Sequence, residues 1–146
     1  MSYLIDTIIN AVPADAITSL AARFGVTPEV ASQAVGGIVP TILAGMASKV
    51  QQGDAGGLAE LIRHAAQTST DESGAFVSTL FGGRLSGVVT ALADSFGVRS
   101  DLIHSLFAYL SPVIAGIVTS RLNGHVTAEG VRSLFESEKS TILGAL

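Results

Sequence analysis

Two stretches of nineteen residues, 30–48 and 102–120, contain no Asp, Glu, Lys or Arg. Each follows directly on an acidic residue and is closed by a basic one, an order that matches the dipole of an α-helix. Each also carries one proline, Pro40 or Pro112. Because proline removes a helical hydrogen bond, each stretch is either one kinked helix or two helices that meet at the proline. The two stretches therefore predict long apolar helices at the centre of the fold.

The residues before each stretch repeat as well, at an offset of about 72 positions. Phe24-Gly25-Val26 becomes Phe96-Gly97-Val98, and glycine commonly ends an α-helix. We interpret the pattern as an internal duplication, 2–67 and 74–139, within one domain of residues 1–146. The predicted fold is all-α, in two tandem copies of a multi-helix module. Each copy holds a helix, a helix ending in Phe-Gly-Val, the long proline-interrupted helix and a short helix.

Local signals mark the expected ends of the helices. Ser2 is expected to cap the first helix, and Thr27-Pro28-Glu29 corresponds to Arg99-Ser100-Asp101, in which Ser100 is the expected cap. Three glycines predict a turn after the first long helix, and the polar residues 68–73 predict a loop: Gly53, Gly56 and Gly57. The apolar spacing of the second helix predicts four buried residues: Ile17, Leu20, Ala21 and Phe24.

The composition excludes several classes of protein. Charged residues make up only 14% of the chain, against about 25% in an ordinary soluble domain, while hydrophobic residues make up 48%. The net charge of −4 argues against binding nucleic acid through bulk electrostatics. No cysteine is present, which removes disulfides and thiolate sites. The first residues do not resemble a secretory signal, so the expected location is the cytoplasm.

Catalytic and cofactor-binding patterns are also absent from the sequence. It contains no G-x-S-x-G elbow, and its glycine pairs lack the Lys-Ser/Thr of a phosphate loop. Asp101 with His104, and Glu60 with His64, have the spacing of neighbours on one helix face. The two pairs do not occupy equivalent places in the two copies, so they do not indicate a metal site. We expect no enzyme activity, no cofactor and no metal.

The residues that carry the repeat also carry a family resemblance. Phe96-Gly97-Val98, Ser100-Asp101 and the run from Leu106 to Gly116 resemble the YidB-like bacterial family of unknown function, with its DUF937-type helical domain. The run Gly36 to Gly45 is similar in the first copy. The resemblance implies an all-α fold, homeodomain-like in part, and no assigned activity. A homeodomain-like part makes nucleic-acid association the alternative function, although the expected recognition helices carry few base-reading side chains.

Small residues recur at every fourth position along both long stretches: Ser32, Gly36, Pro40, Ala44 and Ser48, then His104, Ala108, Pro112, Gly116 and Ser120. Such a stripe lets another helix approach closely, either inside the chain or at a seam between subunits. Together with the low charge, it predicts a non-enzymatic assembly module that acts by helix packing. The expected partners are further copies of the chain or other protein helices. Nucleic acid and membrane are the less favoured partners, with peripheral membrane association the third reading.

Overall fold

The computed structural model describes residues 4–67 and 75–144, and this part of the chain is helical with no strand. Its elements are α1 (Leu4–Ala11), α2 (Ala14–Phe24), α3 (Pro28–Gln51), α4 (Ala55–Ala66), α5 (Ala75–Phe81), the 3-10 turn η1 (Gly82–Arg84), α6 (Leu85–Phe96), α7 (Ser100–Arg121) and α8 (Ala128–Gly144). The all-α prediction is confirmed. The expected cap Ser2 and the expected loop 68–73 lie outside the described residues.

The two long uncharged stretches form the continuous helices α3 and α7, each with its proline inside. Of the two alternatives at Pro40 and Pro112, the structure therefore has the single helix. Both prolines are buried. Near each proline a hydroxyl donates to the carbonyl four residues earlier: Thr41 Oγ1 to Gly37 at 2.8 Å, and Ser111 Oγ to Phe107 at 2.7 Å. These bonds satisfy polar groups within an otherwise apolar layer.

The two Phe-Gly-Val sequences end α2 and α6 in the same way. Gly25 and Gly97 take left-handed φ angles of 70° and 63°. The next N–H, of Val26 or Val98, then donates to the carbonyl five residues earlier, at 2.9 and 3.0 Å. This is the Schellman arrangement, and it turns the chain directly into the following long helix.

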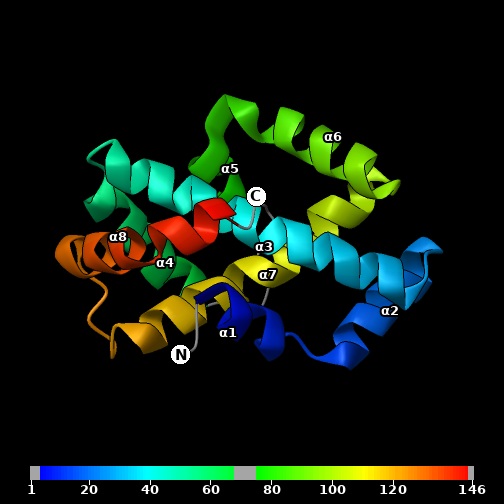
Figure 1. Cartoon of the computed structure of the whole chain (residues 1–146), viewed down its shortest axis with the longest axis horizontal. Coiled ribbons are helices and arrows are strands. Elements are labelled where there is room, and N and C mark those ends of the chain that lie inside the picture. Colours follow the sequence, from blue (N-terminus) through cyan, green and yellow to red (C-terminus); the bar gives the residue numbers. More distant parts are fainter. Residues whose placement is uncertain (1–3, 68–74, 145–146) are drawn as a thin grey trace.

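Three local expectations need correction. Thr27 Oγ1 does accept the Val30 N–H at 3.3 Å, but Ser100 lies inside α7, whose N-cap is Arg99 with no side-chain cap bond. Gly53 adopts the turn, with φ 84°, whereas Gly56 and Gly57 lie in the first turn of α4. Only Ala21 is buried on α2, while Ile17, Leu20 and Phe24 are partly buried. The reason is that α2 lies at one end of the molecule, where α3 and α7 cover one side of it (Figure 1).

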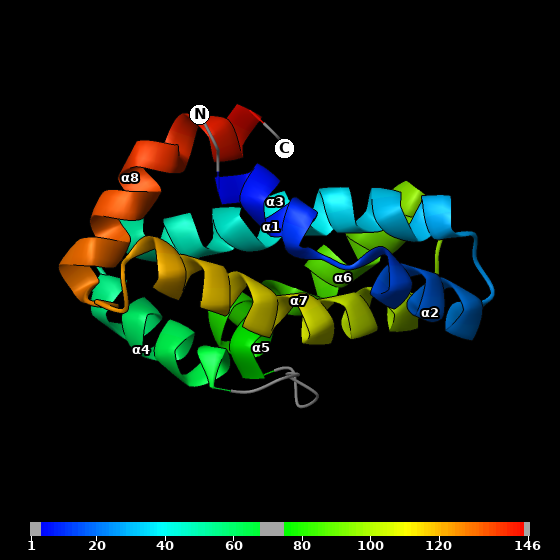
Figure 2. The same ribbon diagram turned by 90° about the horizontal axis from the view of Figure 1, so that it is seen from below.

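The long helices α3 and α7 run in the same general direction and cross near the centre of the molecule (Figures 1 and 2). The shorter helices surround them. The helix α4, which follows α3 in sequence, packs mainly on α7, and α8, which follows α7, packs on α3 and α4. The two halves of the chain are therefore interlocked, because each gives its last helix to the long helix of the other.

The contacts between helices fall into matched sets when residue numbers are shifted by about 72. The pairs α2–α3 and α6–α7 correspond, as do α1–α7 and α5–α3, and α4–α7 and α8–α3. The match is incomplete, because α3 contacts α4 while the backbones of α7 and α8 do not approach each other in the same way. This pairing supports the duplication, which stays a prediction about the origin of the chain.

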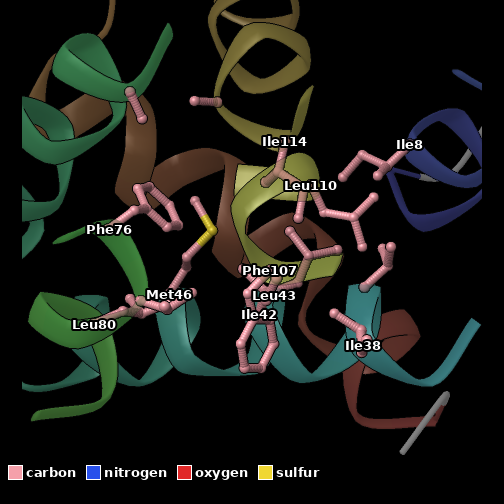
Figure 3. Packing of buried hydrophobic residues seen from close by; sticks show 14 of the residues in the cluster. Ile8, Ile38, Ile42, Leu43, Met46, Phe76, Leu80, Phe107, Leu110 and Ile114 are labelled. Carbon is pink, nitrogen blue, oxygen red and sulfur yellow. The ribbon is translucent and has the colours of Figure 1, made fainter. Parts of the chain in front are cut away.

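One cluster of buried apolar side chains fills the space between the helices. At its centre, Ile42, Leu43 and Met46 of α3 face Phe107 and Leu110 of α7 (Figure 3). Figure 3 also shows Ile8 of α1, Phe76 and Leu80 of α5, Ile38 and Ile114 around these residues. Both halves contribute to this one cluster, which joins them into a common core.

Candidate helix-packing surface

The ten small residues of the predicted stripe do not lie on one continuous face. On α3, Ser32 and Gly36 are exposed and Pro40 is buried. On α7, Pro112 is again buried, and three members are exposed: His104, Gly116 and Ser120. The other members, Ala44, Ser48 and Ala108, are partly buried. A step of four residues overshoots one helical turn by about 40°, so a four-residue stripe winds around the helix. Its middle faces the core and its ends reach solvent.

Side chains of other helices come closest to α3 at Gly37 and Gly45, each one residue after a position of the stripe. A Cβ added at Gly37 would lie 2.7 Å from Cε2 of Phe96, and one at Gly45 would lie 2.8 Å from Cε1 of Phe81. At Gly36, one position away from Gly37, nothing lies within 4 Å. Gly37 and Gly45 therefore admit aromatic rings of α6 and α5. These two positions could not be predicted, because small residues occur in both registers of α3 and spacing alone does not choose between them.

Adding one methyl group at Gly45 is expected to destabilise the chain, whereas the same change at Gly36 is not. Gly45→Ala presses on the buried Phe81 ring, which leans on Phe107 with 6.3 Å between centroids, and such overpacking costs about 1–3 kcal/mol. Gly36→Ala enters open space and gains about 0.5–1 kcal/mol of helix propensity. Urea unfolding of both variants measures the difference, and equal shifts would refute the assigned register.

The surface carries two grooves beside the stripe. One, of about 240 Å³, lies between α3 and the α5–α6 region, and its lining combines apolar and glycine residues with two hydroxyl residues and one arginine: Thr41, Ala44, Gly45, Ser48, Phe81, Arg84 and Val88. The other, of about 390 Å³, lies between α2 and the start of α3, and its lining includes Ser32. Three stripe residues, Ser32, Ala44 and Ser48, thus line grooves. We call the first of these the α3–α6 groove.

A polar network that the sequence analysis did not foresee joins α1, α7 and α8. Glu138 of α8 is buried, and its Oε1 accepts the N–H of Leu4 at 3.2 Å and lies 3.4 Å from Nη1 of Arg121. Nη2 of Arg121 donates to Oγ1 of Thr7 at 3.0 Å. The carboxylate therefore sits at the N-terminus of α1, where the helix dipole favours a negative charge. Its partners are 17 and 134 residues away, beyond the reach of local sequence patterns.

The titratable pairs considered for metal binding point to solvent. Asp101, His104, Glu60 and His64 are all exposed. Among the residues that the structure describes, no group of three or more His, Asp or Glu side chains lies close enough to hold a metal ion. These side chains behave as ordinary surface residues of α4 and α7.

Three segments have the length and mean hydropathy of a membrane span: Pro28–Gln51, Phe76–Phe96 and Ser100–Arg121. The first and third, α3 and α7, bury 61% and 56% of their most apolar windows within the chain itself. Phe76–Phe96 buries only 33% of its window, although its mean hydropathy is 1.4. The α5–α6 segment is therefore the least covered of these three apolar segments.

Comparison with protein-family models matches the chain twice, over residues 6–78 and 64–121, to a family described as "Bacterial protein of unknown function (DUF937)". The chain belongs to this family. The resemblance to a DUF937-type domain is thus confirmed, and each match contains one of the two proline-bearing helices, α3 or α7. Two matches are compatible with two copies of a DUF937 module. Neither curated proteins nor solved structures gave a significant match.

Proposed function

We propose that this DUF937 chain is a non-enzymatic assembly module that binds further copies of itself by helix packing. The observation that carries the proposal is the α3–α6 groove. Its lining includes the apolar Phe81 and Val88, two stripe residues, Ala44 and Ser48, and one cation, Arg84. It borders the α5–α6 segment, the least covered of the three long apolar segments. Apolar surface of this kind on a chain with only 14% charged residues favours protein partners.

Two other readings have less support. Exposed basic residues are spread over several elements, such as Arg23 on α2 and Arg84 on η1. The helix α8 carries two, Arg132 and Lys139, but the exposed Glu136 lies between them in sequence. A nucleic-acid reader concentrates such residues along one element. The hydropathy of α3 and α7 favours membrane insertion. However, more than half of the most apolar window of each helix is buried inside the chain itself.

A charge placed in the groove is expected to weaken self-association. Ala44→Lys puts an ammonium beside Phe81 and Val88 in the groove, and loss of one central packing contact is expected to raise the dissociation constant about tenfold or more. Gln33→Lys is the matched control, because it makes the same charge change at an exposed position of the same helix. Size-exclusion chromatography with light scattering measures the mass of each variant over a range of concentrations.

Three outcomes would count against the proposal. If Ala44→Lys and Gln33→Lys weaken association equally, the groove is not the contact. If the unmodified chain floats with liposomes, membrane association replaces self-association. If it shifts duplex or single-stranded DNA at low salt, the nucleic-acid reading replaces it.

A further inference from the structure

The helix α8 is placed on parts of the molecule that are distant from its own connection. It contacts α3, α4 and α1, and its backbone does not pack along α7, the helix that precedes it. Val131 and Phe135 are the buried apolar anchors, at 0% and 1% exposure, and Glu138 adds the bonds to Leu4 and Arg121. Figure 2 shows α8 turned back from the end of α7.

The connection between α7 and α8, residues 122–127, contains two residues with left-handed backbone angles. Asn123 has φ 54°, the only positive φ at a non-glycine residue among those described, and Gly124 follows with φ 83°. Two backbone hydrogen bonds close the turn. The N–H of Asn123 donates to the carbonyl of Ser120 at 3.0 Å, and the N–H of Gly124 donates to the carbonyl of Thr119 at 2.9 Å. Because α8 packs on distant elements and not along α7, opening this one turn is enough to let α8 occupy the same place on another copy of the chain.

We propose that two copies of this chain exchange α8. In the exchanged dimer the turn at Asn123 and Gly124 opens, and α8 of each copy takes the same place on α3 and α4 of the other. Val131, Phe135 and Glu138 keep the contacts they have in the closed chain, so only the connection changes. The surface that accepts the second copy is the one α8 covers, which is separate from the α3–α6 groove. The exchange does not depend on the function proposed for that groove.

Introduced cysteines distinguish the closed chain from the exchanged dimer. The chain has no cysteine of its own. A Cβ at Gly56, on α4, would lie 3.9 Å from Cβ of Ala128, at the start of α8, and both positions are exposed. This separation is within the roughly 3.5–4.5 Å that a disulfide requires. In Gly56→Cys/Ala128→Cys, a closed chain forms the bridge within itself, whereas an exchanged dimer forms it between chains.

The double variant is refolded under reducing conditions at increasing concentration, oxidised, and run on a denaturing gel without reductant. The expected result is a covalent dimer whose ratio to monomer rises about tenfold for each tenfold increase in concentration while most of the chain is still monomeric. Gly56→Cys/Thr90→Cys reports random cross-linking, because α4 and α6 do not contact each other. Ala44→Lys in the same background is expected to leave the covalent dimer unchanged. A bridge only within chains at every concentration would overturn the exchange, even if the groove still associates.

Variants of the turn test the same inference without cysteine. Gly124→Ala places a side chain at a left-handed residue and so destabilises the closed turn. It is expected to raise the dimer fraction after refolding roughly tenfold. Asn123→Gly relieves that conformation and is expected to lower the fraction. Light scattering measures the dimer fraction of each variant. A dimer fraction that is the same in both variants as in the unmodified chain contradicts the exchange.

Discussion

The separated halves of the chain, residues 1–67 and 74–146, are expected to be largely unfolded alone and to regain helix when mixed. In the first half, α4 loses α7 and α8, on which it mainly packs. In the second half, α8 loses α3 and α4. Helices of this length are marginal in water without tertiary packing. Circular dichroism of each fragment, and of an equimolar mixture at low micromolar concentration, measures the effect.

A duplication alone would give a different result. If each copy were a separate domain, both fragments would fold independently and the mixture would show the sum of their spectra. The interlocked arrangement instead predicts helicity well above that sum. Native-like helicity in either fragment alone, at a concentration where it is monomeric, would contradict the interlocking of the two halves.

Phe107→Ala is expected to be among the most destabilising substitutions in this chain. Phe107 is 1% exposed and lies at the crossing of α7 with α3 (Figure 3). The centroid of its ring is 6.3 Å from that of Phe81. Truncating a buried phenylalanine leaves a cavity and costs about 3–5 kcal/mol. A domain is stabilised by only about 5–15 kcal/mol, so the variant loses a large share of its stability. Thermal and urea unfolding measure the loss.

Phe96→Ala is the matched control for that substitution. Phe96 is only partly buried, at the end of α6 against Gly37, so its truncation removes less buried area. We expect a loss of about 1–2 kcal/mol. Similar losses for Phe96→Ala and Phe107→Ala would show that the crossing of α3 and α7 is not the centre of the core.

The helices themselves were predictable from sequence because their signals are local. Gly25 and Gly97 end α2 and α6 as expected, and the uncharged stretches around Pro40 and Pro112 became α3 and α7. The partner of each helix was not predictable. An apolar spacing shows which face of a helix is buried but not what buries it. The packing of α4 on α7, and of α8 on α3, therefore appeared only in the structure.

The candidate surface was predicted only in part, for two physical reasons. A stripe with a period of four residues departs from the helical period of 3.6, so its members turn away from any single partner. The contacts that need glycine, at Gly37 and Gly45, depend on where Phe96 and Phe81 arrive from other helices. Glu138 likewise acquires its role from Leu4 and Arg121, which come close only in the folded chain.

Self-association is the central claim, and the mass of the unmodified chain in solution tests it most directly. Sedimentation equilibrium over a wide range of protein and salt concentrations is the measurement. We expect a mass that rises with protein concentration to a multiple of 14.9 kDa and that persists at high salt, because helix packing is not an ionic contact. A mass of 14.9 kDa at every concentration and salt would contradict it.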